Sequence, residues 1–223
     1  MSHPESSDEN TNKAQQRSSR RAEEFELVQK ALDGDDRAFR TLVERHQRRV
    51  YALAFGLVRD REEAWDIAQE AFVKAYRNLG RFQGKSAFYT WLYRITYNLS
   101  MDALRARARR DVVQIDGNRA TEAAAAEEAP NSSHPARQAA RRELAGAINT
   151  AMSHLSDKHR AIIVLREIEG LSYQEMSEVL KISKGTVMSR LFHARRNLQA
   201  LLQPYVEQGQ AVGVSPELAP QGA

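Results

Sequence analysis

Residues 80–86 form the first segment whose residue types suggest a chemical activity. The segment ends in Gly84-Lys85-Ser86, the closing tripeptide of a phosphate-binding P-loop, which would predict hydrolysis of a nucleoside triphosphate. A P-loop places four residues between its first glycine and Gly-Lys-Ser, and it connects a strand to a helix. Here three residues separate Gly80 from Gly84, and the residues before Gly80 have a helical pattern. The spacing therefore argues against an NTPase, and this function ranks below the two others considered later in this section.

The same segment begins a run that is rich in aromatic rings. Of the chain's 7 Phe, 7 Tyr and 2 Trp, six lie in residues 80–98, namely Phe82, Phe88, Tyr89, Trp91, Tyr93 and Tyr97. A stripe formed by Phe88, Leu92, Ile95 and Leu99 already supplies one core face of a helix. The other rings then have two interpretations: they fill the edge of the core with their hydroxyls in water, or some stack on unpaired bases, at roughly 1–3 kcal/mol per base.

A second candidate site lies near the C-terminus. Ser172 and Glu175 have the spacing of a capping box at the start of a short helix that runs to Leu180. After a turn at residues 181–183, a second helix begins near Lys184 and carries Arg190, His193, Arg195 and Arg196. This is the layout of a helix-turn-helix. An ordinary helical hairpin would bury the same apolar residues, but it does not need these cations, so DNA binding is favoured.

Helices must position both sites, because apolar residues recur at helical spacing on either side of one interruption. We predict an all-α protein with two helical domains, over residues 25–110 and 138–205, the second of which contains the helix-turn-helix. Residues 111–137 are rich in Ala and Glu, contain two prolines and lack an apolar period, which predicts a flexible acidic linker. Residues 1–24 are polar and are expected to be a disordered tail, and residues 206–223 form a C-terminal tail.

The charge is distributed unevenly along the chain, although the net formal charge is only +4. The N-terminal domain carries 17 Lys and Arg against 11 Asp and Glu, the C-terminal domain 10 against 6, and the linker 2 against 5. Two basic blocks favour a nucleic-acid partner over a merely solvated mixed-charge surface.

The composition also excludes several kinds of site and of cellular location. The absence of cysteine excludes disulfides and thiolate metal sites, and the six histidines form no metal-ligand pair. No apolar run is long enough to span a membrane, and the N-terminus lacks the apolar core of a signal peptide. We therefore expect a cytoplasmic protein with no metal and no other cofactor.

One predicted helix is acidic although it lies inside the basic N-terminal block. On the helix over residues 61–78, Asp66, Gln69 and Glu70 share one exposed face through their i, i+3 and i+4 spacing. An acidic face repels DNA. It is either a solvated face with a favourable acidic N-terminus or a docking surface for a basic helix of a protein partner.

Together, these segments resemble the bacterial sigma factors of RNA polymerase, most closely the extracytoplasmic function (ECF) group and its σ-E-like members. Residues 66–76, Asp-Ile-Ala-Gln-Glu-Ala-Phe-Val-Lys-Ala-Tyr, resemble the helix that docks on the clamp coiled coil of the polymerase β′ subunit. Residues 82–98 resemble the segment that melts and reads the minus-ten promoter element. Residues 170–175 and 185–195 resemble the reader of the minus-thirty-five element.

The resemblance implies a role for individual residues. Core polymerase would be contacted by Asp66, Gln69, Glu70 and Phe72. The minus-ten element would be contacted by Phe82, Lys85, Ser86, Phe88, Tyr89, Trp91, Arg94 and Asn98, with Asn98 in the pocket for a flipped base. The minus-thirty-five element would be contacted by Lys184, Thr186, Ser189, Arg190, Phe192, His193 and Arg195. The sequence departs from the family's common pattern at two positions of this reader, where Met188 replaces a basic residue and His193 replaces an arginine.

The implied partners are core RNA polymerase, through its β′ and β subunits, promoter DNA and an anti-sigma factor. No small-molecule substrate is implied, and the chain would not be an enzyme on its own. The main alternative is a helix-turn-helix repressor or activator that never joins polymerase. Such a protein would bind its duplex site alone, and it needs neither an acidic docking helix nor an aromatic melting segment.

Overall fold

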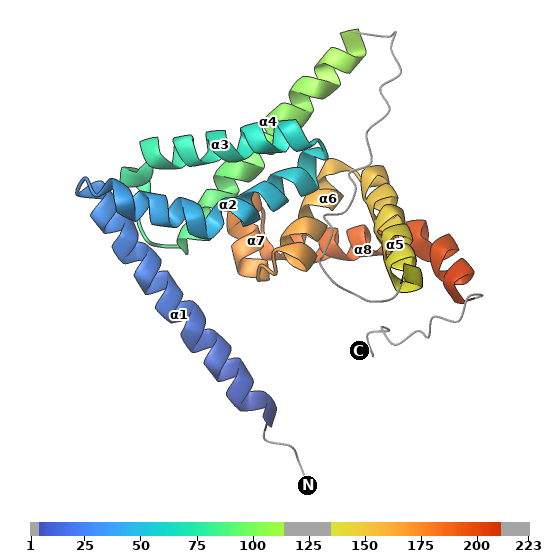
Figure 1. Cartoon of the computed structure of the whole chain (residues 1–223), viewed down its shortest axis with the longest axis horizontal. Coiled ribbons are helices and arrows are strands. Elements are labelled where there is room, and N and C mark those ends of the chain that lie inside the picture. The colour runs from blue at the N-terminus through green and yellow to red at the C-terminus, as the bar shows by residue number, and fades with distance from the viewer. Residues whose placement is uncertain (1–4, 114–134, 211–223) are drawn as a thin grey trace.

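Every regular element is a helix in the part of the chain that the computed structural model describes, residues 5–113 and 135–210 (Figure 1). The N-terminal domain contains α1 (Glu5–Leu32), α2 (Asp36–Val58), α3 (Arg61–Arg77), the short 3-10 helix η1 (Leu79–Arg81) and α4 (Phe88–Val113). The C-terminal domain contains α5 (Pro135–His154), α6 (Asp157–Ile163), the π-helical turn η2 (Val164–Ile168), α7 (Tyr173–Leu180) and α8 (Lys184–Gln210). The predicted all-α class is confirmed.

Local capping residues fix where the helices of the N-terminal domain begin. Gly34 adopts a positive φ of 97° after α1, a conformation that glycine reaches without strain. The Asp35 carboxylate then accepts a hydrogen bond from the backbone N–H of Arg37 at 2.9 Å, and Asp60 accepts one from Glu63 at 2.9 Å. These are N-caps, which satisfy backbone donors left free at a helix start. The starts of α2 and α3 therefore follow from residues that lie within the same turn.

The first helix differs from the predicted disordered tail over residues 1–24. Helix α1 runs unbroken from Glu5, and Figure 1 shows its N-terminal half projecting away from the other helices. Its C-terminal half is anchored by contacts that the sequence does not reveal. The Arg21 guanidinium donates to the carbonyl oxygens of Gly84 at 2.8 Å and Lys85 at 2.9 Å. Glu24 is buried and pairs with the ring of His46 at 3.0 Å.

The C-terminal domain has the predicted helix-turn-helix in α7 and α8. Ser172 and Glu175 form the expected capping box at the start of α7. Lys181 turns the chain in the left-handed conformation, with φ 53°, and the Ser183 hydroxyl accepts from the N–H of Thr186 at 3.1 Å to cap α8. The π-helical turn η2 was not predicted, and Gly170 ends this stretch with φ 69°.

At three predicted boundaries the helices continue past the predicted limit. Helix α4 continues to Val113 and α5 begins at Pro135, so both enter the ends of the predicted linker. Helix α8 continues to Gln210, into the predicted C-terminal tail. The remainder of the linker and of that tail lies outside the described residues.

The two domains pack against each other, with α2 contacting α6 and η2, and α4 contacting α7. The approach is close at Gly56, where an added Cβ atom would lie 3.0 Å from Cγ2 of Val164. Beside it, the buried Arg160 side chain donates to the carbonyl oxygen of Leu57 at 2.8 Å. The same guanidinium donates to the carbonyls of Met152 and Leu155, each at 3.0 Å. One cation therefore caps the ends of α2 and α5, one from each domain.

Candidate nucleic-acid interface

The second helix of the helix-turn-helix, α8, presents most of its predicted DNA-contacting side chains to solvent. Val187, Leu191 and Ala194 are buried against the rest of the C-terminal domain. The residues between them therefore point outward, as the helical period requires. Exposed members of the predicted set are Lys184, Thr186, Ser189, Phe192, His193 and Arg195, and Arg190 is partly buried. The sequence thus brings these seven positions together on one helix.

Several side chains on this surface are held by local partners. The hydroxyls of Thr186 and Ser183 lie 2.9 Å apart. Arg195 donates to the Glu167 carboxylate at 2.6 and 2.9 Å, and the rings of Phe192 and His193 meet edge to face with centroids 5.4 Å apart. This arrangement can insert into a major groove and offer cations to phosphates together with polar and apolar groups to base edges.

The aromatic segment is organised differently from the expectation of base-facing rings. Phe82, Phe88 and Trp91 are only 7%, 1% and 7% exposed, and their ring centroids lie 5.5 to 5.8 Å apart. They therefore pack as part of the core. The physical reason is that the three rings also pack against helices of their own domain, with Phe82 against Phe25 of α1 and Phe88 against His46 of α2.

The polar members of the predicted minus-ten set are more accessible. Asn98 and Lys85 are exposed, and Arg94 and Ser86 are partly exposed. The backbone of the loop that carries Lys85 is fixed by Arg21 from α1. As the domains are arranged here, these polar groups are available to DNA, whereas the three core rings are not.

Two tyrosines of the aromatic segment contact the other domain. The hydroxyl of Tyr93, which is fully buried, donates to the Glu169 carboxylate, and that of Tyr89 donates to Glu175. Arg49 of α2 approaches the same Glu169, with its Nε 3.1 Å from the carboxylate and its Nη2 3.0 Å from the backbone carbonyl. We call Arg49, Tyr93 and Glu169 the interdomain cluster. Burial, and then the neighbouring carboxylate of Glu169, raise the pKa of the Tyr93 hydroxyl.

The acidic face of α3 is exposed at Asp66, Gln69 and Glu70, as predicted from their spacing. Glu70 also pairs with Lys74 at 2.9 Å. The fourth predicted polymerase contact, Phe72, is only 9% exposed and belongs to the hydrophobic core, because it shares the apolar stripe of Ala68 and Ala75.

Sequence reasoning missed two exposed apolar side chains beside this acidic face. Trp65 is 53% exposed and Val73 is 47% exposed. Both lie four residues from Gln69, so the same i, i+4 spacing that grouped the acidic residues would have found them. The face is therefore a mixed surface, with carboxylates next to large apolar groups.

Other functional contacts had no signal in the sequence. Arg49 and Glu169 are separated by 120 residues, and Arg160 and Leu57 by 103.

Over the described residues, no group of three or more His, Cys, Asp or Glu side chains is placed to hold a metal ion. No helix within the described ranges has the length and apolar character needed to cross a membrane.

The comparisons with known proteins agree with this organisation. Residues 42–110 match Sigma-70 region 2, and residues 145–198 match Sigma-70, region 4. The chain is 40% identical over 192 residues to the RNA polymerase sigma-H factor of Pseudomonas aeruginosa, covering 82% of this chain and 95% of that protein. It is 38% identical over 184 residues to the ECF RNA polymerase sigma-E factor of Escherichia coli K12, covering 81% and 94%.

Two solved structures share the fold. One is the sigma factor RpoE in complex with the anti-sigma factor NepR from Bartonella quintana, with a TM-score of 0.61 and 26% identity over 74% of this chain and 96% of that one. The other is CnrH in complex with the cytosolic domain of CnrY, with a TM-score of 0.57 and 29% identity over 80% and 96%. From the two matched regions and these relatives, the chain belongs to the sigma-70 family and is a sigma factor of the ECF type.

Proposed function

We propose that this sigma factor joins core RNA polymerase in the cytoplasm, directs it to a class of promoters and helps to open the DNA there. Residues 25–110 would dock on polymerase and act at the minus-ten element, and residues 138–205 would bind the minus-thirty-five element. The observation that carries the proposal is that one chain holds both sigma regions in order, each with an exposed surface of suitable chemistry. The phosphodiester chemistry would belong to polymerase.

The direct test is run-off transcription with purified core polymerase, with and without this chain. We expect promoter-specific transcripts only when the chain is added. The main alternative, a repressor or activator that works without polymerase, predicts tight and specific binding of the chain alone to its duplex site and no dependence of transcription on it. That pair of results would overturn the proposal.

The polymerase contact is assigned to the exposed face of α3. Asp66 and Glu70 would meet a basic helix of the β′ subunit, with Trp65 and Val73 supplying apolar contact beside them. Reversing both charges, Asp66→Lys with Glu70→Lys, should weaken binding to core polymerase at least tenfold while helix content by circular dichroism stays unchanged. Rim charges usually act on association rate and salt dependence, so binding is measured across a salt series.

A matched control places the same change of charge elsewhere. Glu44 on α2 and Asp102 on α4 are also exposed acidic residues, and they lie outside the proposed contact. Glu44→Lys with Asp102→Lys should bind core polymerase nearly as the wild type does. Equal losses for the two double variants would show a general charge effect and would remove the assignment to α3.

Control by an anti-sigma factor is part of the proposal. The two solved relatives described above are both complexes with a partner, one named as an anti-sigma factor and one as the cytosolic domain of CnrY. We infer that this chain is regulated in the same general way. The interdomain cluster supports this, because a partner that stabilised the packed arrangement would keep the two DNA-facing domains together.

A further inference from the structure

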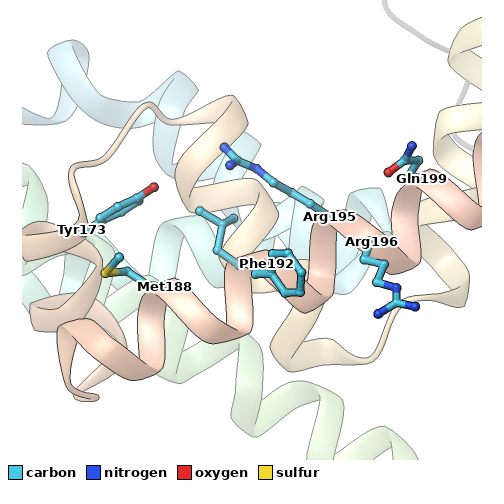
Figure 2. Close-up of a pocket in the computed structure, with 7 residues that line it drawn as sticks. Tyr173, Met188, Phe192, Arg195, Arg196 and Gln199 are labelled. Atoms are coloured by element: carbon cyan, nitrogen blue, oxygen red, sulfur yellow. The ribbon is translucent and has the colours of Figure 1, made fainter. Parts of the chain in front are cut away.

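The recognition helix α8 carries apolar side chains where a DNA-reading helix needs its contacts. Met188 is 55% exposed and Phe192 is 62% exposed. They are four residues apart and therefore lie on the same side of the helix. The core of the domain does not need them, since Val187 and Leu191 already fill the buried side. Figure 2 shows both side chains on the outer side of the helix.

The two side chains form a shaped surface. With Tyr173 and Leu191 they line a shallow cavity of about 540 Å³ that continues to Arg195 and Arg196. The Tyr173 ring is held by Arg166, whose guanidinium carbon lies 5.0 Å from the ring centroid. The Phe192 ring contacts that of His193. The walls of the cavity are therefore positioned before any ligand arrives.

The charges around this cavity favour a polyanion as its occupant. Lys184 at the start of α8 and Arg196 beyond Phe192 are both exposed, so cations lie on either side of the apolar pair along the helix. Phosphates flanking a base pair would meet those cations, while the base edge would meet the apolar pair. An apolar helix of a protein partner would gain nothing from the cations.

A thymine methyl group is the one apolar group on the major-groove edge of a base pair. The Met188 thioether has no hydrogen-bond donor and is only a weak acceptor, so it cannot distinguish bases by hydrogen bonding. We propose that Met188, together with Phe192, reads thymine methyl groups in the minus-thirty-five element. The inference rests on the proposed function and adds a specificity-determining residue to it.

The test removes single methyl groups from DNA. A preferred minus-thirty-five sequence is first selected from a randomised promoter library with the holoenzyme. Each thymine of that element is then replaced by deoxyuridine, and holoenzyme affinity is measured. Burial of one methyl group corresponds to about a fourfold change in affinity, so we expect about a fourfold loss at one or two thymines.

The Met188→Ala holoenzyme should bind the thymine promoter about as weakly as the wild-type holoenzyme binds the promoter with uracil at that position. In the variant, the uracil replacement should cause no further loss of affinity. Met188→Arg should shift preference at that base pair toward guanine, because arginine pairs with its O6 and N7 acceptors. The control is Ile168→Ala. Ile168 is equally exposed, at 59%, but is not among the residues lining the cavity, so this variant should keep the wild-type uracil profile.

Three results would overturn the inference: a selected element without thymine, a wild-type holoenzyme insensitive to every uracil replacement, or a Met188→Ala variant as sensitive as the wild type. The last result would favour a protein partner as the occupant of the cavity. A failure of the proposed function is distinguishable, because the holoenzyme would then select no promoter sequence at all.

Discussion

The aromatic segment at residues 80–98 and the recognition helix α8 were both predicted to meet DNA, and they hold their large side chains in opposite ways. Phe82, Phe88 and Trp91 are buried, whereas Phe192 and Met188 point into solvent. A helix that reads an intact duplex can be fully formed before DNA arrives. Rings that belong to a core can stack on a base only if that core rearranges, so at the aromatic segment the exposed polar groups are the first to be available.

The two surfaces also differ in how they depend on the other domain. The face of α8 that carries Met188 and Phe192 is exposed although the domains are packed together. Tyr89 and Tyr93 of the aromatic segment, in contrast, donate to carboxylates of the C-terminal domain. The packed arrangement therefore restricts the aromatic segment and leaves the outer face of α8 accessible.

The largest expected effect separates the buried rings from the exposed ones. Trp91→Ala removes a ring from the core and should lower the free energy of unfolding by about 3–5 kcal/mol. Phe192→Ala removes a ring that is mostly in solvent and should change it by less than about 0.5 kcal/mol. Urea unfolding followed by circular dichroism measures both. Similar losses for the two variants would contradict the difference in packing.

The second prediction concerns the interdomain cluster. Glu169→Ala removes the carboxylate that accepts from Tyr93 and from Nε of Arg49, and hydrogen bonds to charged groups contribute about 1.5–3 kcal/mol each. Because Arg49 is half exposed, we expect the free energy of unfolding to fall by an amount near the lower end of that range. The domains should also separate more often, which small-angle X-ray scattering would detect as a larger radius of gyration.

Glu167→Ala is the control for the interdomain cluster. Glu167 is exposed and pairs with Arg195 of its own domain, so its loss should leave the radius of gyration unchanged. An unchanged radius in the Glu169 variant as well would mean that the cluster does not hold the domains together.

A smaller effect should appear at high pH. The pKa of Tyr93 is raised in the folded chain, so the folded state keeps its proton while an unfolded tyrosine loses it above a pKa of about 10. This contribution to stability is complete below pH 10 and decreases as the pH rises further, by up to about 1.4 kcal/mol per pH unit. Tyr93→Phe should make the decline in stability between pH 10 and 11 shallower. Parallel curves for the two proteins would count against the buried hydroxyl as the cause.

The smallest expected effect on folding, with a specific effect on function, is that of Asn98→Ala. Asn98 is exposed, so stability should change by less than about 0.5 kcal/mol. Its amide offers a donor and an acceptor to the edge of an unpaired base, so open-complex formation should fall and preference at one minus-ten position should relax. Permanganate footprinting, together with transcription from promoters varied at each minus-ten base, measures this. Wild-type melting and unchanged preference would remove the role.

The features that the sequence predicted correctly are those that depend on neighbouring residues. The predicted Ser172–Glu175 box caps α7 within one turn of itself, and the helical period of α8 determined which of its side chains point outward. The number of buried faces on α4 could not be predicted, because it depends on a helix from the other domain. The interdomain cluster joins residues 76 and 120 positions apart, a separation at which no local pattern exists.

If the two domains move apart, the end of α2 loses its bond to Arg160, whereas the end of α5 keeps its bonds to that residue. The guanidinium keeps its bonds to Met152 and Leu155 within the C-terminal domain when it leaves the Leu57 carbonyl. The end of α5 is thus capped in either arrangement, whereas the last turn of α2 exchanges a charged donor for water. By thermodynamic linkage, a partner that caps the last turn of α2 in place of Arg160 lowers the free energy needed to separate the domains. A partner that binds the packed chain raises that free energy.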